Sequence, residues 1–393
     1  MEMVQDAGGI VVVGGGMVGA AAALGLAQAG LRVTVLENSP PPPFVADSDP
    51  DLRISAISMA SVRLLEQLGV WSAVCAMRAV PYRGLETWEW ASSTVSFRAE
   101  TLGLPCLGFM LENRVLQRAL WQALEACEGV TLYTGAALQQ LQRDRQGWRL
   151  ALDNGERLYA GLVIAADGAE SRVRSQAGIG VHGWQYRHDC MLISVKTSPV
   201  PQDVTWQQFT PDGPRAFLPL WPGWGSLVWY DSPARIRQLL AMPLAQLNEA
   251  ILRTFPARLG PVQAVAAAAF PLIRRHALRY VDQGLLLLGD AAHTINPLAG
   301  QGVNLGYRDV SALLEVVPAA AARGEAWQTQ AVLQRYQRRR LGDNLLMQSG
   351  MDLFYGAFSN RLPPLTLLRN LGLMAAERAG GLKARALRYA IGL

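Results

Sequence analysis

The chain has 393 residues, 50% of them hydrophobic and 17% charged, which is too apolar for a disordered chain and too often interrupted by charge for a polytopic membrane protein. This length exceeds that of a single compact core, so we expect two or more lobes. The net charge of +5 is modest, and no helix-turn-helix, zinc-finger or RNP-like pattern accompanies it, so nucleic acid is not an expected partner.

The first predicted unit is a strand, a glycine-rich turn and a helix. Residues 10–13 are typical of a buried parallel strand, residues 20–29 have a helical pattern, and between them stands Gly14-Gly15-Gly16-Met17-Val18-Gly19. Gly14 permits the tight turn, Gly16 lets the backbone approach a diphosphate, and Gly19 lets the helix pack on the strand. The next strand, residues 31–36, ends at Glu37, which can accept hydrogen bonds from a ribose diol. This order predicts a dinucleotide site and leaves open whether the dinucleotide is FAD or NAD.

The same region offers an alternative, because residues 10–31 contain no charge and are long enough to span a bilayer. Its glycines make it weakly apolar, and Glu2 and Asp6 precede it where a membrane signal would carry basic residues. We therefore interpret it as strand, turn and helix, and expect a cytoplasmic protein that is at most peripheral to a membrane.

Two later strands also end at an acidic residue. Residues 163–166 are followed by Asp167 and Gly168. Residues 285–288 run into a longer motif, Gly289-Asp290-Ala291-Ala292-His293, then Asn296-Pro297 and Gly300-Gln301-Gly302-Val303-Asn304. Asp290 can accept from a ribityl hydroxyl, and the turn at residues 300–302 directs N–H groups and a helix N-terminus toward the pyrimidine edge of a flavin. The pairing of this motif with the first one indicates FAD.

The second lobe is predicted to be an antiparallel sheet that covers the flavin, because short turns separate its strands. These strands are residues 191–197, 205–210, 215–220, 226–230 and 267–273. Phe217 is our candidate for contact with a substrate, although aromatic residues on such strands more often belong to the core. His293 is a candidate base, but we favour a structural hydrogen-bonding role for it.

Basic residues are concentrated at the end of the chain, where residues 335–393 carry ten basic and three acidic side chains, a net charge of +7. Helical periodicity there is broken at Pro363-Pro364 and resumes at residues 365–376 and 382–391. Either these helices pack on the flavin domain, or they dock on an anionic membrane surface or a protein partner.

The four cysteines are Cys75, Cys106, Cys127 and Cys190, and they have neither metal-ligand spacing nor a C-x-x-C pair. We expect four buried free thiols in a reducing compartment and no bound metal.

The three motifs, in this order, resemble the group A flavoprotein monooxygenases over nearly the whole chain. Within that family the resemblance is strongest to the ubiquinone-biosynthesis hydroxylases, through residues 51–57 and 289–306. It implies an α/β fold with a Rossmann-like FAD-binding domain, similar to that of para-hydroxybenzoate hydroxylase, interleaved with an antiparallel substrate domain and a C-terminal helical segment. The implied bounds are 1–180 and 276–335 for the FAD-binding domain, with 81–105 contributing to the substrate lobe, then 181–275 for the substrate domain and 336–393 for the helical region.

The resemblance also implies roles for single residues. Glu37 holds the adenosine ribose, Arg53 and Asn113 contact the flavin nucleotide, and Asp167 lies near the diphosphate, acting through water or a backbone turn. Relatives often carry Arg or Gln where Asn113 stands, so this shorter side chain reaches less far. Pro297 is expected beside the isoalloxazine face, where it shapes the site, and no protein base is assigned. The full cofactor-binding set is Gly14, Gly16, Gly19, Glu37, Arg53, Asn113, Asp167, Asp290, Pro297, Gly300, Gln301, Gly302 and Asn304.

The implied activity is hydroxylation of the ring of a polyprenylated benzoquinol in ubiquinone biosynthesis, through a flavin C4a-hydroperoxide. Dioxygen is the co-substrate, and NAD(P)H or another donor reduces the flavin. The expected surroundings are the inner membrane surface and a multi-protein ubiquinone-biosynthesis assembly. Alternatives are a hydroxylase of another aromatic compound or ring position, a flavin dehydrogenase or prenyl reductase, and a noncatalytic scaffold that binds FAD.

Overall fold

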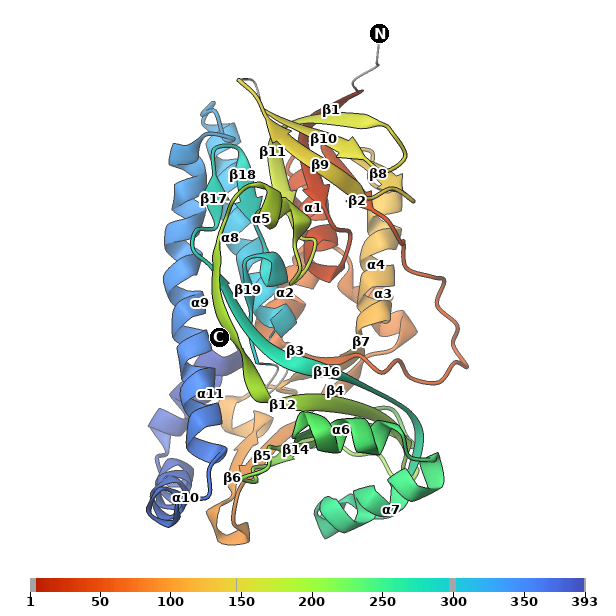
Figure 1. The fold of residues 1–393 in the computed structure, drawn as a ribbon, viewed down its shortest axis with the longest axis vertical. Coiled ribbons are helices and arrows are strands. Elements are labelled where there is room, and N and C mark those ends of the chain that lie inside the picture. The colour runs from red at the N-terminus through yellow and green to blue at the C-terminus, as the bar shows by residue number, and fades with distance from the viewer. Residues whose placement is uncertain (1–4, 146, 297–301, 392–393) are drawn as a thin grey trace.

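The computed structural model describes residues 5–145, 147–296 and 302–391 and shows two lobes joined by long strands (Figure 1). The upper lobe in this view is an α/β unit and the lower lobe is built on an antiparallel sheet. Helices from the end of the chain line one side of both lobes. The order of elements therefore matches the expected α/β fold with an interleaved second sheet and a helical C-terminal segment.

The upper lobe contains an eight-stranded sheet whose parallel strands follow the order β18-β11-β1-β2-β8. Buried Val, Ile and Leu fill β18, β11, β1 and β2, as expected for a parallel sheet covered on both faces, whereas the edge strand β8 is partly exposed. The strands are β1 (Gln5–Val13), β2 (Val33–Glu37), β8 (Val130–Thr134), β9 (Leu138–Arg143), β10 (Trp148–Leu152), β11 (Arg157–Ala165), β17 (Val281–Asp282) and β18 (Leu285–Leu287). The helices of this lobe are α1 (Met17–Gln28), α2 (Met59–Gln67), α3 (Trp71–Met77), α4 (Asn113–Glu125), α5 (Arg172–Gln176) and α8 (Gly302–Ala322), with the short 3-10 helix η4 (Gly289–Ala291).

The charge-free region near the N-terminus divides into β1, a turn and α1, so its interpretation as strand, turn and helix is confirmed. In the part of the chain that the structure describes, no helix combines the length and the apolar character needed to cross a bilayer.

The lower lobe contains the second eight-stranded sheet, in the order β19-β16-β12-β15-β14-β13-β5-β6. All neighbours are antiparallel except β13 and β5, which are parallel. The strands are β5 (Gly84–Trp88), β6 (Val95–Arg98), β12 (Val181–Lys196), β13 (Val204–Gln208), β14 (Arg215–Pro219), β15 (Trp224–Asp231), β16 (Gln263–Ala277) and β19 (His293–Thr294). Helices α6 (Pro233–Leu240) and α7 (Leu244–Thr254), followed by η3 (Ala257–Leu259), cover one face. Near the opposite face lies a small sheet of β3 (Ile54–Ser58), β7 (Gly108–Glu112) and β4 (Val80–Tyr82).

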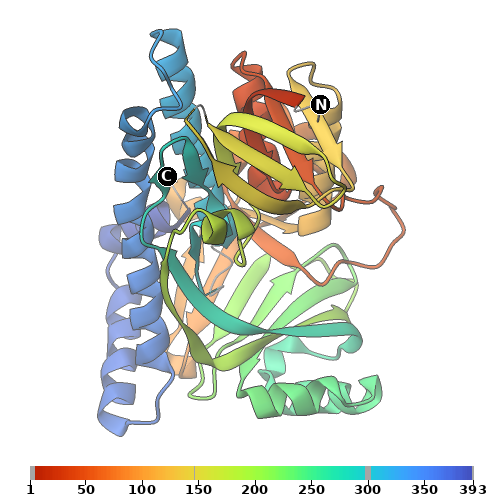
Figure 2. The ribbon, with the colours of Figure 1, turned by 45° about the horizontal axis from the view of Figure 1, so that its top comes forward.

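Two long strands, β12 and β16, connect the lobes. They pair from Val181 with Ala277 at one end to Lys196 with Gln263 at the other, and both strands can be followed from one lobe to the other (Figures 1 and 2). Both are longer than the strands predicted at residues 191–197 and 267–273.

The C-terminal helices divide between the lobes. Helix α9 (Gln330–Phe358) packs along α8, whereas α10 (Pro363–Glu377) packs on β6 and on the 3-10 helix η1 (Ala91–Ser93). Helix α11 (Gly381–Ile391) contacts η2 (Ala99–Leu102) and also bonds to α8, where Arg308 Nη2 donates to the Tyr389 carbonyl at 3.0 Å. Packing on the flavin domain, expected for residues 365–376 and 382–391, is therefore wrong for α10, whereas α11 bonds to α8 of that domain and also contacts η2.

The four cysteines are free. Cys106 and Cys190 are buried, but Cys75 is exposed and Cys127 is half-buried, which corrects the expectation of four buried thiols. Among the described residues, no group of three or more His, Cys, Asp or Glu side chains is placed to hold a metal ion.

Candidate functional site

The glycines of the first motif differ in what surrounds them. A Cβ atom on Gly14, whose φ is +103°, would lie 2.4 Å from the Ala166 carbonyl oxygen, and one on Gly19 would lie 1.9 Å from the Gly14 oxygen. These two glycines allow the turn, the helix and the end of β11 to pack closely. A Cβ on Gly16 would meet nothing within 4 Å. Gly16 therefore borders open space at the N-terminus of α1, where a diphosphate would approach.

Glu37 ends β2, and the backbone orients its carboxylate. The Gly15 N–H donates to Oε2 at 2.7 Å, and the Ser39 N–H donates to Oε1 at 3.0 Å. The Gly15 carbonyl in turn accepts from Trp121 Nε1 at 2.7 Å and from Gln117 Nε2 at 3.1 Å, both on α4. Each carboxylate oxygen can accept a further hydrogen bond, so the side chain can still bind a diol.

Arg53 and Asn113 come together although 60 positions separate them in the sequence. The Asn113 N–H donates to the Arg53 carbonyl at 3.0 Å, because β3 and β7 are paired at this point. The Asn113 Oδ1 atom accepts from the Ser55 hydroxyl at 2.6 Å. The Arg53 guanidinium is exposed and lies 5.7 Å from the ring centre of Phe270, on the lower sheet. Arg53 thus stands between the lobes.

The Asp167 carboxylate bonds to the beginning of α5. Its Oδ1 accepts from the Ser171 hydroxyl at 2.5 Å, and its Oδ2 accepts from the Val173 N–H at 3.1 Å. Because both oxygens orient this helix, Asp167 positions the backbone near the glycine-rich turn. A role of Asp167 near a diphosphate stays a prediction.

Asp290 follows β18 in the short helix η4, next to Gly289. Its carboxylate is accessible to solvent although protein surrounds it on most sides. This surrounding protein raises the pKa of the Asp290 carboxyl, while His293 and Arg53 act to lower it. An accessible carboxylate at the carboxyl end of a strand is placed to accept hydrogen bonds from a polyol chain.

A buried carboxylate on α8, Asp309, holds this motif in place. Its Oδ2 accepts from the Gly289 N–H at 3.0 Å and bonds to His293 Nε2 at 2.6 Å. Its Oδ1 accepts from Arg340 Nε at 2.7 Å and from Asn344 Nδ2 at 3.1 Å, both on α9. Burial alone would raise the pKa of Asp309, but His293 and Arg340 outweigh it and lower the pKa to about 2. His293 is therefore a structural partner of Asp309, as we favoured.

Gln348, also on α9, extends this contact by one more turn. Its Nε2 donates to the Thr294 carbonyl at 3.0 Å and to the Arg275 carbonyl at 2.8 Å. Its Oε1 lies 2.8 Å from His276 Nδ1, and burial lowers the pKa of His276 to about 4, so the neutral ring donates to Gln348. Arg340, Asn344 and Gln348 recur every four residues and thus share one face of α9. The four-residue spacing of these polar side chains is visible in the sequence, but we did not predict that they support the second motif.

The last part of the second motif is described from Gly302, where α8 begins. The Asn304 amide joins α8 to β3 and α2: its Oδ1 accepts from the Ser58 N–H at 2.9 Å and from the Ser61 hydroxyl at 2.8 Å, and its Nδ2 donates to the Ala56 carbonyl at 2.8 Å. Asn304 therefore positions the helix that was expected to point at the flavin. Pro297, Gly300 and Gln301 lie outside the described residues.

The expected substrate contact by Phe217 is corrected by the structure. Its ring is 1% exposed and stacks on Trp206 at a centroid distance of 5.7 Å, in the cluster covered by α6 and α7. Side chains alternate between the faces of a strand, so the neighbours Ala216 and Leu218 point to the other face. Leu218 packs there with Ile54 of β3.

The face of the lower sheet that turns toward β3 and Arg53 is apolar and partly accessible. Leu192, Leu218, Val228 and Phe270 are all half-buried on it. Tyr230, on the same face, donates its hydroxyl to Asn296 Oδ1 at 3.1 Å and so joins the sheet to the second motif. An aromatic ring placed against this face would lie between the sheet and the cofactor motifs.

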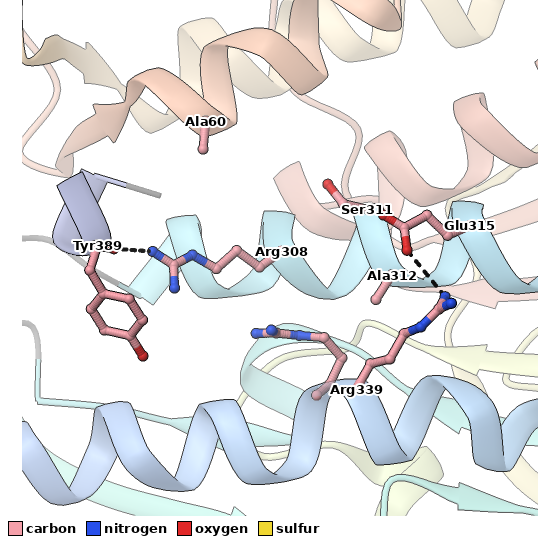
Figure 3. A pocket seen from close by; sticks show the side chains of 8 residues that line it. Ala60, Arg308, Ser311, Ala312, Glu315, Arg339 and Tyr389 are labelled. Carbon is pink, nitrogen blue, oxygen red and sulfur yellow. Dashed lines mark hydrogen bonds and ion pairs between the residues drawn. The ribbon is translucent and has the colours of Figure 1, made fainter. Parts of the chain in front are cut away.

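A separate pocket of about 490 Å³ lies among α2, α8, α9 and α11 (Figure 3). Its basic side chains already have partners: Arg308 bonds to the Tyr389 carbonyl, Arg339 lies 3.1 Å from Glu315, and Arg340 bonds to Asp309. Because these charges are paired, the pocket is not a candidate anion site, and the motifs described above do not line it.

Comparison with known proteins agrees with this geometry. The profile of the family described as "FAD binding domain" matches residues 9–344. The chain is 65% identical to the 3-demethoxyubiquinol 3-hydroxylase of Escherichia coli K12, over 98% of each chain. It is 35% identical to the ubiquinone hydroxylase UbiL of Rhodospirillum rubrum, over 98% of this chain and 89% of that protein. Its fold is similar to that of p-nitrophenol 4-monooxygenase PnpA from Pseudomonas putida, with a TM-score of 0.81 and 21% identity over 100% of this chain and 99% of that one.

Proposed function

This chain belongs to the FAD-binding-domain family of flavin-dependent monooxygenases, and on that premise we propose that it hydroxylates the ring of a polyprenylated benzoquinol in ubiquinone biosynthesis. The observation that carries this proposal is the 65% identity to the 3-demethoxyubiquinol 3-hydroxylase, which extends over nearly the full length of both chains. We further propose that the substrate is a 3-demethoxyubiquinol.

The described residues fit FAD. Gly16 borders open space at a helix N-terminus, Glu37 presents an oriented carboxylate, and Asp290 presents an accessible one. We propose that these residues hold the diphosphate, the adenosine ribose and the ribityl chain, respectively. Arg53 and Asn113 would contact the flavin nucleotide, and the start of α8 at Gly302 would face the flavin. For Pro297, Gly300 and Gln301, the same roles are proposed from the sequence motif alone.

When bound and reduced, FAD supplies the activation of dioxygen and the transfer of one oxygen atom to the ring. The chain itself places the substrate ring beside the flavin and excludes water from the site. The half-buried Leu192, Leu218, Val228 and Phe270 form an apolar wall against which a quinol ring can lie and from which water is displaced. A quinol already carries electron-donating hydroxyl groups, so we assign no protein base. NAD(P)H or another donor is the proposed reductant.

The proposed substrate also suggests where the protein works. A polyprenyl tail partitions into lipid, so we propose a cytoplasmic protein that meets the inner membrane surface through its C-terminal region, alone or within a multi-protein ubiquinone-biosynthesis assembly. The net charge of +7 in residues 335–393 supports contact with anionic lipid.

The test is turnover of a short-tailed 3-demethoxyubiquinol by the FAD-loaded protein under oxygen-18 gas. We expect substrate-dependent consumption of the reductant and one labelled oxygen atom in the product. Anaerobic turnover with an artificial acceptor, without label, would instead indicate a dehydrogenase or reductase. In a strain that lacks its own 3-hydroxylase, expression of this chain should remove the accumulated demethoxyquinone, and persistence of that quinone would refute the substrate assignment.

A further inference from the structure

Helix α10 is held to the lower lobe by its polar residues. The Arg369 guanidinium binds the Glu89 carboxylate through two nitrogens, with Nε 2.7 Å from Oε2, and both side chains are almost fully buried. Asn370 Nδ2 donates to the same carboxylate at 2.6 Å, and Asn370 Oδ1 accepts from the Ser93 hydroxyl at 2.5 Å and from the Trp90 N–H at 3.2 Å. Removing either charged partner would leave a buried unpaired ion, so this orientation of α10 is strongly preferred.

The opposite side of α10 is apolar and faces solvent. At 100° per residue, Leu367, Leu368 and Leu371 lie across the helix from Arg369 and Asn370. Their exposed fractions are 51%, 63% and 50%. Leu362 and Leu365 are also exposed near the start of the helix. Rotating the helix to bury these leucines would break its bonds to Glu89, so the apolar side stays outward. We call Leu367, Leu368 and Leu371 the α10 leucine face.

Basic residues stand in the sequence at both ends of α10 and recur in α11. Residues 361–391 contain six basic side chains, of which Arg361 pairs with Asp212, Arg369 with Glu89 and Lys383 with Glu377. Glu377 is occupied locally, because it accepts from Lys383 Nζ at 2.6 Å and from the Ser96 N–H at 2.8 Å. Arg378, Arg385 and Arg388 are exposed and have no acidic partner within 4 Å in the described parts of the chain. An apolar side with a cationic border is the pattern of a helix that lies in a membrane interface.

We infer that the α10 leucine face docks this protein on an anionic lipid bilayer. The surplus of positive charge is complementary to anionic headgroups, and it disfavours a second copy of the same face by repulsion. Helix α10 lies at the margin of the molecule in both views, and it packs on β6 and η1, at the edge of the lower sheet (Figures 1 and 2). Docking would thus bring the lower lobe to the surface in which a polyprenyl tail dissolves, a step that rests on the proposed function.

The test measures binding of the FAD-loaded protein to vesicles by sedimentation, without substrate. The vesicles are phosphatidylcholine alone or phosphatidylcholine and phosphatidylglycerol in roughly equal parts. We expect binding to the anionic vesicles that weakens with salt. Replacing Leu367, Leu368 and Leu371 by Gln should lower partitioning on the order of tenfold or more, because each leucine loses its burial in the interface.

The matched control replaces three leucines of similar exposure on α6 and α7. Leu240, Leu244 and Leu252 are 41%, 47% and 54% exposed, and their change to Gln should leave vesicle binding unaltered. Equal binding by the α10 variant and the wild type would overturn the inference. The inference would also be overturned if the wild type were a dimer in solution and the α10 variant a monomer with unchanged vesicle binding. The α10 leucine face would then join two copies of the chain.

Turnover of a water-soluble, short-tailed quinol without vesicles separates this inference from the proposed function. The α10 variant should retain that activity, because its substitutions lie outside the cofactor and ring site. A wild type that hydroxylates the quinol but ignores vesicles refutes only the docking surface. A wild type that binds vesicles without hydroxylating any quinol refutes only the proposed function.

Discussion

Asp309→Asn should weaken both folding and flavin binding, because one buried carboxylate serves Gly289, His293 and Arg340. The pKa of Asp309 is about 2, against 3.8 for an unperturbed aspartate. A shift of this size corresponds to on the order of 2 kcal/mol of stability at neutral pH. Leaving Arg340 with fewer partners in the interior adds to this loss. We expect the variant to lose about 3 kcal/mol of unfolding free energy and to bind FAD roughly tenfold more weakly.

The pH dependence has a definite direction. The pKa of Asp309 is lower in the folded state than in the unfolded state, so its contribution to stability is fully present above about pH 4. It is lost as the pH falls through about 2. The difference in stability between the wild type and Asp309→Asn should therefore be constant near neutral pH and narrow between about pH 4 and about pH 2.

The assay is denaturant unfolding of the FAD-free protein across this pH range, with flavin affinity measured by quenching of FAD fluorescence. Asp343→Asn is the matched control, because Asp343 also binds Arg340 but is 27% exposed and does not bond to Gly289. That control should cost no more than about 1 kcal/mol and leave FAD affinity unchanged. If the two variants have equal stability and equal FAD affinity, the role assigned to Asp309 is wrong.

Three further predictions follow from single contacts. Gly16→Ala should weaken FAD binding but leave the melting temperature of the FAD-free protein unchanged, because its Cβ would meet nothing within 4 Å. Gly19→Ala should lower that melting temperature, because its Cβ would lie 1.9 Å from the Gly14 oxygen. Equal melting temperatures for the two FAD-free variants would contradict this. Arg369→Ala should leave Glu89 buried and unpaired, at a cost of about 3 to 5 kcal/mol, and should make α10 sensitive to limited proteolysis; an unchanged digestion pattern would argue against it. Phe217→Leu should lower the unfolding free energy by about 1 kcal/mol or more, because the ring is buried in the core. It should leave KM for the quinol unchanged, because Phe217 packs away from the cofactor motifs. A raised KM would indicate that Phe217 contacts the substrate.

The parts that could be predicted from the sequence are those that local patterns determine. The glycine spacing at residues 14–19 reports on packing within one turn, and the structure confirms the turn between β1 and α1. The five strands predicted for the second lobe are present; short connections join the first four, whereas α6, α7 and η3 lie between β15 and β16. The break at Pro363-Pro364 is also present, although both prolines begin α10, where a missing N–H costs nothing.

The missed parts depend on which face a side chain takes or on partners far apart in sequence. Phe217 lies within the apolar run Ala216-Phe217-Leu218, so the apolar pattern could not show which face its ring takes. Asp309 meets Arg340 across 31 positions and serves Gly289 across 20, and no local rule relates them. Strand β12 begins at Val181 because polar residues there pair with β16, which an apolar pattern does not reveal.

The pairing of β11 with β18 has a consequence for how the protein is made. The two strands meet in register at Ala165 and Leu287, about 120 residues apart, and all but one short strand of the lower sheet is encoded before β18. During synthesis, β1, β2, β8, β10 and β11 can assemble early, but the part of the β11 edge at Val163–Ala165 stays uncovered until Leu285–Leu287 emerges. An open apolar strand edge is prone to wrong pairing. Biogenesis of the dinucleotide lobe therefore waits for translation of nearly the entire second lobe, and the nascent chain is most vulnerable to aggregation in that interval.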